Sequence, residues 1–213
     1  MKSCLGVENR FGPGMVNANR LWHKQGVMQP VSRQRADHRP RPPLDAAKLG
    51  ELALSYVGRF ATSRGKLVDY LRRKLRERGW DGEAEPDLAA IAERLAGIGY
   101  IDDAAFALSK ARVLGGRGYG AARVRQTLHA AHIEETDREG ALDHADGNRV
   151  EAALKLARRR RIGPFAAEKL DPVARQKAIG AMLRAGHPLA LSRAIVDLSP
   201  GHSIDHSWLV ELR

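Results

Sequence analysis

Apolar residues recur at helical spacing along most of the chain. Between residues 47 and 60, Leu49, Leu52 and Tyr56 follow the spacing of three or four residues that places side chains on one face of a helix. β-Branched and aromatic residues never alternate for long, so the sequence predicts no strands. Further helices are predicted at 64–78, from about 86, and at 102–114, 121–131, 136–143, 150–161, 174–185 and 188–197. The expected fold class is therefore all-α.

Residues typical of helix ends support this pattern. Ser63 and Asp102 stand directly before two of the predicted helices, where a short polar side chain can accept a hydrogen bond from a free backbone N–H group. Gly79 follows the helix at 64–78 and is well suited to end it. Pro86 is tolerated in a first helical turn.

The helices fall into three sets of three. The residues that close the middle helix of each set, Gly79, His132 and Gly186, are spaced 53 and 54 residues apart. A short helical unit cannot bury its apolar face alone, so tandem three-helix repeats stacked into a curved, elongated array are the simplest interpretation. Chance similarity among helices rich in Ala, Leu and Arg is the alternative, because the third set needs an insertion near 162–170. At these spacings the core positions Leu71, Val124 and Ala178 align, as do Leu75, Leu128 and Met182.

This interpretation divides the chain into five parts. Residues 1–43 are rich in Pro and Arg with little to bury, and they are predicted to be a disordered basic arm. The three repeats are expected at 44–101, 102–148 and 149–198. Residues 199–213 are expected to be a C-terminal tail with one docking turn at Trp208 and Leu209.

The charge is strongly basic but unevenly distributed. The net charge is +11, and the arm at 1–43 has eight Lys or Arg residues against two acidic ones, which leaves +5 for the rest. Such a surplus favours a polyanionic partner such as nucleic acid or an acidic protein surface. No apolar run of about 18 residues predicts a membrane span, and the N-terminus lacks the apolar stretch of a signal peptide. With Cys4 as the only cysteine, a cytoplasmic location is expected.

A glycine-rich corner, GGRGYG at Gly115–Gly120, precedes the helix at 121–131. A Walker loop needs Lys and then Ser or Thr after its last glycine, but Ala121 and Ala122 follow Gly120. A dinucleotide fingerprint needs a preceding strand, and a helix is predicted there instead. The corner is therefore not expected to bind a nucleotide, although free N–H groups at the start of the next helix could contact one backbone phosphate.

Clustered arginines are the candidate contacts for a partner. They lie on or just after the predicted helices, and a solvated helix face is the alternative interpretation for any single one. As a set, they could follow a nucleic-acid backbone or an acidic protein groove. The candidates are Arg72, Arg73, Arg117, Arg123, Arg125, Arg158 and Arg159.

The sequence predicts no enzyme, cofactor or metal site. His129 and His132 share a helix face, as do His202 and His206, but no cysteine accompanies either pair. Asp102 is explained by capping, and the adjacent Asp103 would point away from it on a helix. No combination of residues for nucleophilic catalysis is recognisable.

One segment resembles a known family. GYIDDAAFALSKARVLGGRGYGAARVRQTL, from Gly99 to Leu128, is similar to the central signature of the bacterial RecX regulatory proteins. Residues 53–80 are similar to the first repeat of that family, with Gly65 and Lys66 departing from its pattern. The matching residues are Gly99, Tyr100, Ile101, Asp102, Asp103, Phe106, Arg117, Gly118, Tyr119, Gly120, Arg123, Arg125 and Leu128.

The resemblance implies a non-enzymatic regulator of the RecA recombinase. It implies a protein that binds the RecA filament on single-stranded DNA and inhibits its extension, ATP hydrolysis and strand exchange, in DNA repair, recombination and the SOS response. A monomer is expected. Direct DNA binding would be secondary, and Tyr100, Phe106 and Tyr119 would be structural. A stand-alone nucleic-acid-binding protein, suggested by the charge, is the main alternative, and a helical adaptor for another protein is a third.

Overall fold

The regular secondary structure of the protein is helical throughout the part of the chain that the computed structural model describes, residues 42–204 and 206–212. An isolated bridge between Leu44 and Trp80 is the single β contact there. The prediction of an all-α fold is confirmed. The helices are α1 (Ala46–Arg59), α2 (Arg64–Arg78), α3 (Leu88–Gly97), α4 (Asp103–Gly116), α5 (Ala121–His129), α6 (Glu135–Gly147), α7 (Arg149–Arg160), η1 (Gly163–Phe165), α8 (Pro172–Arg184), α9 (Leu189–Asp197) and α10 (His206–Val210).

The predicted helix ends agree closely with the structure. Ser63 Oγ accepts a hydrogen bond from Lys66 N at 3.2 Å, and Asp102 Oδ1 accepts one from Ala105 N at 2.8 Å. Helix α3 begins at Leu88 rather than near Pro86, because the Asp87 side chain caps it. Helix α6 extends to Gly147, four residues beyond the predicted end, and its buried alanines explain the extension: Ala145 lies one turn after Ala141 on the same face.

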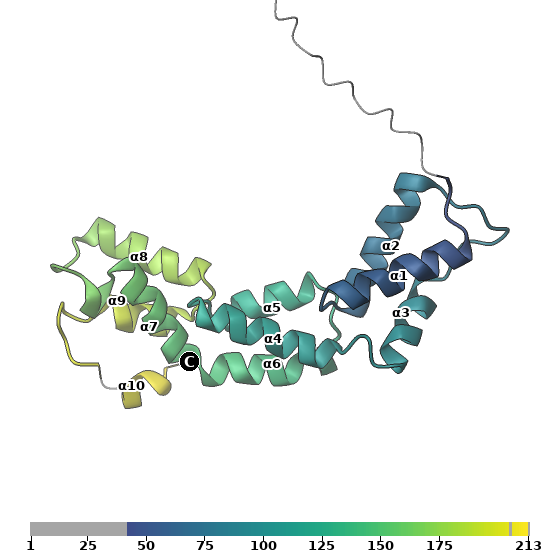
Figure 1. Ribbon diagram of the computed structural model, residues 1–213. Coiled ribbons are helices and arrows are strands. Elements are labelled where there is room, and N and C mark those ends of the chain that lie inside the picture. The colour runs from purple at the N-terminus through teal and green to yellow at the C-terminus, as the bar shows by residue number, and fades with distance from the viewer. Residues whose placement is uncertain (1–41, 205, 213) are drawn as a thin grey trace, which may run out of the picture. The chain divides into compact units, whose positions relative to one another are not determined.

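The first group of helices contains α1 to α3 (Figure 1). Its core consists mainly of leucines and alanines. Leu49, Leu67 and Leu71 are fully buried in it. On the edge of this core the rings of Tyr56 and Tyr70 stack with their centroids 4.2 Å apart. The first group therefore has an aliphatic core with aromatic side chains at its edge.

The second group, α4 to α6, has its own core, in which Val124 and Leu128 of α5 are fully buried. Alanines fill the interface between α4 and α6, and small side chains let helix backbones approach closely.

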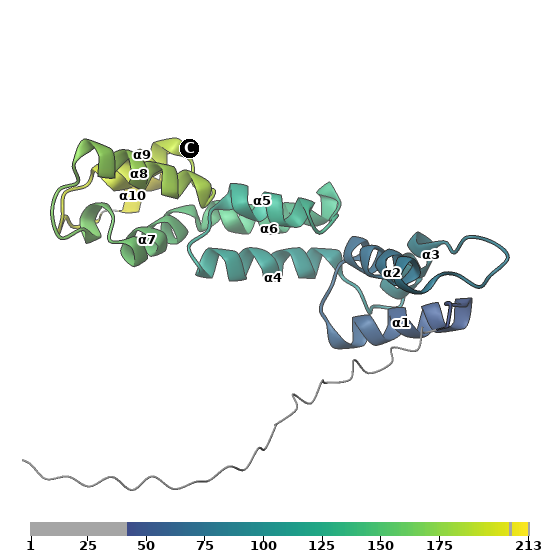
Figure 2. The ribbon, with the colours of Figure 1, turned by 90° about the horizontal axis from the view of Figure 1, so that it is seen from above.

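The third group contains α7 to α10 (Figure 2). Leu209 of the short helix α10 is fully buried in its core, whereas the neighbouring Trp208 is 39% exposed. The docking turn near the C-terminus is thus formed by Leu209. The side chain of Arg149 also donates to the carbonyl oxygen of Val210, which ties this turn to the start of α7.

Several corners of the described chain have positive φ, and the three that close the middle helices are among them. Gly79, His132 and Gly186, the residues that close the three middle helices, have φ of +81°, +53° and +92°. Glycine adopts this conformation without a Cβ penalty, whereas His132 does so as a bulkier residue. The equal spacing of these residues in the sequence corresponds to one shared backbone feature.

The segment just before α1 packs on the end of α2. Leu44 is fully buried, its N–H group donates to Gly79 O at 3.0 Å, and its carbonyl oxygen accepts from Asp81 N at 2.8 Å. Arg78 donates to Pro42 O from Nε at 3.1 Å. Apart from Pro42 and Pro43, the predicted basic arm lies outside the described residues. Within the described chain, no helix is long and apolar enough to span a membrane.

Candidate functional site

The glycine corner lies where the second and third groups of helices meet. Gly118 has a φ of +79°, and a Cβ atom at this position would lie 2.9 Å from Leu156 N. At Gly120, a Cβ atom would lie 2.3 Å from Gly186 O. Both glycines are therefore required for close backbone contact with the third group.

Two backbone N–H groups at the start of α5 are occupied by this contact. Gly120 N donates to Ala185 O at 2.9 Å, and Ala122 N donates to Gly186 O at 3.3 Å. These carbonyl oxygens belong to the end of α8, so the negative end of one helix dipole meets the positive end of the next. The expectation that these N–H groups could contact a phosphate was wrong, because protein carbonyls already accept from them.

The start of α2 is joined to the end of α5 in a similar way. Ser63 Oγ donates to Ala131 O at 2.7 Å, and a Cβ atom on Gly65 would lie 2.3 Å from Cβ of His132. His132 Nε2 lies 3.0 Å from Asp69 Oδ2. The C-terminal corner of one middle helix thus contacts the N-terminal end of the preceding middle helix at both junctions.

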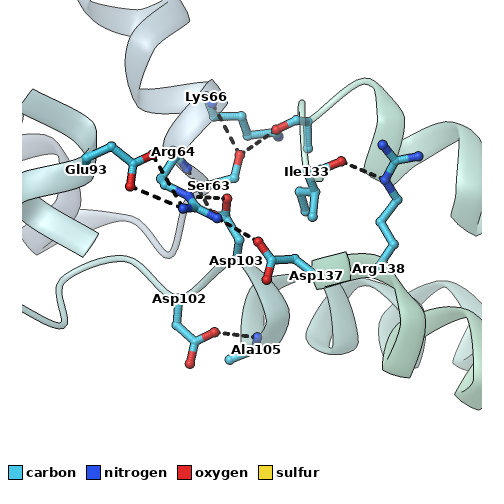
Figure 3. Close-up of polar contacts among 11 residues, drawn as sticks. Ser63, Arg64, Lys66, Glu93, Asp102, Asp103, Ala105, Ile133, Asp137 and Arg138 are labelled. Atoms are coloured by element: carbon cyan, nitrogen blue, oxygen red, sulfur yellow. Dashed lines mark hydrogen bonds and ion pairs between the residues drawn. The ribbon is translucent and has the colours of Figure 1, made fainter. Parts of the chain in front are cut away.

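The paired aspartates of the signature have separate structural roles (Figure 3). Asp102 caps α4, as predicted. Asp103 is buried, and its carboxylate accepts from Arg64 N and Arg64 Nε, each at 3.0 Å. One aspartate therefore starts a helix, and the next one holds the first group to the second.

Arg64 is at the centre of a cluster of carboxylates (Figure 3). Besides Asp103, its guanidinium contacts Asp137 Oδ2 at 2.6 Å and Glu93 Oε2 at 3.3 Å. The hydrogen bond that the Arg64 side chain donates to Asp103 is the main reason that the pKa of Arg64 is raised. This cluster was not predicted from the sequence, although the sequence contained one signal for it. An arginine in the first turn of a helix interacts unfavourably with the helix dipole unless an acidic group compensates its charge.

Two of the predicted arginines lie on α2 beside acidic residues. Arg72 Nη1 is 3.0 Å from Asp69 Oδ1, and Arg73 Nε is 3.7 Å from Glu77 Oε1. Both arginine side chains are more than half exposed. Their charges are available to a partner but are partly balanced within the helix.

The other five predicted arginines lie in the glycine corner, on α5 or at the end of α7, and are called here the corner arginines: Arg117, Arg123, Arg125, Arg158 and Arg159. Arg159 Nη1 donates to Arg117 O at 2.6 Å, which joins the end of α7 to the end of α4. Arg123 lies over the Tyr119 ring at 5.9 Å, and Arg158 lies over the Phe165 ring at 5.0 Å. The structure therefore links Arg117 directly to Arg159 and places Arg123 beside the corner.

The corner arginines lack acidic partners. Among the described residues, none of the five forms a salt bridge, and the side chain of Arg123 donates only to an amide oxygen, Gln126 Oε1, at 2.9 Å. All five are exposed. An exposed guanidinium without a carboxylate is free to make bidentate contacts to phosphate or to a partner's carboxylate.

His187 is a further residue of the corner that sequence analysis missed. It is 3% exposed, its Nε2 lies 3.1 Å from Gly118 O, and its Nδ1 is buried without a hydrogen-bond partner. Burial lowers the pKa of His187 below its ordinary value. The neutral imidazole therefore fixes the corner by donating from Nε2. No sequence pattern distinguished it from the other histidines.

The described residues contain no cluster of three or more His, Cys, Asp or Glu side chains that could hold a metal ion. His129 is exposed, and His132 contacts Asp69 rather than a second histidine.

No family model matches the chain. Several curated proteins are similar to it, however. Regulatory protein RecX of Xanthomonas campestris is 36% identical over 118 residues, which cover 54% of this chain and 68% of that protein. Regulatory protein RecX of Thermus thermophilus is 36% identical over 113 residues, covering 53% and 74%. Regulatory protein RecX of Myxococcus xanthus is 26% identical over 176 residues, covering 79% and 94%.

Two solved structures share the fold. A crystal structure of RecX from Lactobacillus salivarius superimposes with a TM-score of 0.55 at 20% identity, covering 70% of this chain and 93% of that one. A crystal structure of a regulatory protein RecX gives a TM-score of 0.52 at 24% identity, covering 70% of each chain.

Proposed function

Because the chain belongs to the RecX family of regulatory proteins, we propose that it regulates the RecA recombinase without catalysing a reaction of its own. It binds the RecA filament on single-stranded DNA and inhibits filament extension, ATP hydrolysis and strand exchange. In this proposal the protein is a monomer and acts in the cytoplasm. There it modulates DNA repair, recombination and the SOS response.

The corner arginines are the structural observation that supports the proposal. Arg117, Arg123, Arg125, Arg158 and Arg159 are exposed and have no salt bridge within the described chain. A nucleoprotein filament presents both phosphates and acidic side chains, and unpaired guanidinium groups suit both. Arg72 and Arg73 contribute a second, partly balanced pair on α2.

The three helix groups are, in this proposal, three tandem repeats at 44–101, 102–148 and 149–198, stacked into a curved, elongated array. The separate cores support three units, and the recurring contact between the end of one middle helix and the start of the preceding one supports their order. Such an array would present its arginines along an extended surface, which suits a helical filament.

The test is RecA-dependent ATP hydrolysis on single-stranded DNA. We expect inhibition at ratios of protein to RecA too low to coat the DNA. R123Q/R125Q is expected to weaken inhibition, whereas R94Q/K177Q removes the same charge from exposed positions on α3 and α8 and should inhibit like the wild type. No inhibition by the wild-type protein at a stoichiometric ratio would refute the proposal.

A stand-alone nucleic-acid-binding protein is the second candidate function, favoured by the net charge of +11. It predicts tight DNA binding without RecA, with affinity that falls steeply as salt increases. Inhibition of RecA only at saturating protein would support this candidate, since coating the DNA would then explain the effect.

A further inference from the structure

Aromatic rings and cationic side chains alternate along one margin of the first helix group and continue onto α4. We call this set the aromatic stripe. Its rings are Tyr56, Phe60, Tyr70 and Phe106, and its cations are Lys66, Arg73, Lys74 and Lys110.

Ring contacts connect α1 to α2. Tyr56 and Tyr70 stack with an interplanar angle of 15°, and the Phe60 ring lies 5.4 Å from that of Tyr56. Phe60 is 57% exposed, although a phenyl ring has no polar group to offer to water. The stripe therefore ends in an accessible ring face that nothing in the described chain covers.

The cations lie over these rings. Lys66 Nζ is 5.6 Å and Lys110 Nζ is 4.9 Å from the centroid of Phe106, which itself is buried. One turn after Lys66 on the same face of α2, Tyr70 has Arg73 at 5.6 Å and Lys74 at 5.8 Å. Lys66 and Lys110 belong to different helix groups, so the stripe crosses the junction between them.

The two lysines at Phe106 are the uncompensated charges of the stripe. Within the described residues, neither Lys66 nor Lys110 forms a salt bridge, whereas Arg73 and Lys74 both contact Glu77, at 3.7 and 2.5 Å. A pair of ammonium groups without carboxylates attracts an anionic ligand.

We infer that the aromatic stripe binds single-stranded nucleic acid, with Lys66 and Lys110 contacting phosphates and Phe60 stacking on a base. One exposed ring on a margin that carries cations suits an unpaired strand, because a base can stack on Phe60 while the backbone passes the ammonium groups. In a duplex the bases are already stacked inside, so Phe60 would have no base face to contact. The site is separate from the corner arginines and needs no RecA.

The experiment is fluorescence anisotropy of the full-length protein with a labelled oligothymidylate and with a duplex of equal length, over a series of salt concentrations and without RecA. F60A is expected to lower the affinity for the single strand about tenfold, since stacking on an aromatic ring is worth roughly 1–3 kcal/mol per base. Its salt dependence should be unchanged. K66Q/K110Q should make the slope of log K against log salt shallower by about 1.4, because each phosphate contact on a single strand contributes about 0.7.

Matched controls lie outside the stripe. W208A removes a partly exposed ring from α10, and K169Q/K177Q removes two exposed lysines from the third helix group, so both should bind like the wild type. Wild-type affinity and slope in F60A and K66Q/K110Q would overturn the inference, as would equal losses in the controls. Variants that lose RecA inhibition but keep single-strand binding would assign the stripe to a protein partner instead. If the wild-type protein binds the single strand as expected but does not inhibit RecA, the proposed function is refuted and this inference stands.

Discussion

Two adjacent aspartates show how much a single residue's environment determines its role. Asp102 is exposed and accepts one backbone hydrogen bond at the start of α4. Asp103, one residue later, has a side chain that is 2% exposed and is bound by Arg64 through both the backbone and the guanidinium. A buried carboxylate that loses its cation, or a cation that loses its carboxylate, is left without compensation.

We therefore expect D103A to destabilise the protein by about 2 kcal/mol, somewhat below the 3–5 kcal/mol typical of breaking a fully buried pair, because Arg64 is partly exposed and keeps Asp137 and Glu93. D102A removes only a helix cap and should cost about 1 kcal/mol. Urea unfolding of both variants measures the difference. An equal or smaller loss for D103A would show that the cluster around Arg64 contributes little to stability.

At the scale of the element, the corner between α4 and α5 shows how a glycine-rich motif serves packing. Gly118 combines a left-handed backbone with a close approach to α7, whereas Gly115 lies inside α4 with no atom within 4 Å of where a Cβ atom would be. The two glycines are three residues apart and have opposite structural demands.

Alanine substitutions at these two positions should change stability in opposite directions. G118A is expected to destabilise by more than about 2 kcal/mol, since the left-handed conformation costs an L-residue roughly 1–2 kcal/mol and the contact with Leu156 adds to it. G115A should stabilise by about 0.5–1 kcal/mol, because alanine is the better helix former. Thermal unfolding of the two variants decides the matter. A stable G118A would mean that the corner rearranges without loss.

Most helices could be predicted from the sequence because their signals are local. The apolar period and the residues Ser63, Gly79 and Asp102 are readable within one turn of a helix end, and the structure uses them as predicted. The occupied N–H groups at α5 could not be foreseen, since their acceptors at Ala185 and Gly186 are more than 60 residues away. The same holds for the candidate site. Exposure of the arginines follows from helix periodicity and could be predicted, whereas their pairing depends on tertiary contacts and could not.

The buried histidine at this corner predicts a pH dependence. Burial lowers the pKa of His187 below its ordinary value of about 6.5. The unfolded chain then binds a proton that the folded protein excludes, so the stabilisation is complete above pH 6.5 and falls as the pH decreases below it.

Urea unfolding between pH 7.5 and 5.5 measures this effect. H187Q keeps a donor for Gly118 O but cannot be protonated, so its stability should change less with pH than that of the wild type. H129Q, at an exposed position on α5, should follow the wild type. Parallel curves for all three proteins would contradict the assignment of a buried neutral imidazole.

At the scale of the whole molecule, basic charge is divided between two parts of the chain. Residues 1–43 hold a surplus of six, and the rest holds five of the total of +11. The proposed functions differ in which part matters: RecA regulation depends on the corner arginines of the folded part, whereas stand-alone nucleic-acid binding would use the basic arm.

Deletion of residues 1–41 separates these functions, and the structure determines where the cut belongs. Pro42 O accepts from Arg78 and Leu44 is buried at the end of α2, so the deletion must stop before Pro42 if the fold is to be kept. The deleted segment contains eight Lys or Arg residues, and neutralising one phosphate per residue would contribute a salt slope of up to about 5.6 on a single strand. If the protein is a RecA regulator, the truncated chain should inhibit RecA ATPase within about twofold of the full chain, even as its own DNA affinity falls. Loss of inhibition in parallel with DNA binding would instead favour coating of the DNA, because both effects would then depend on the same charges.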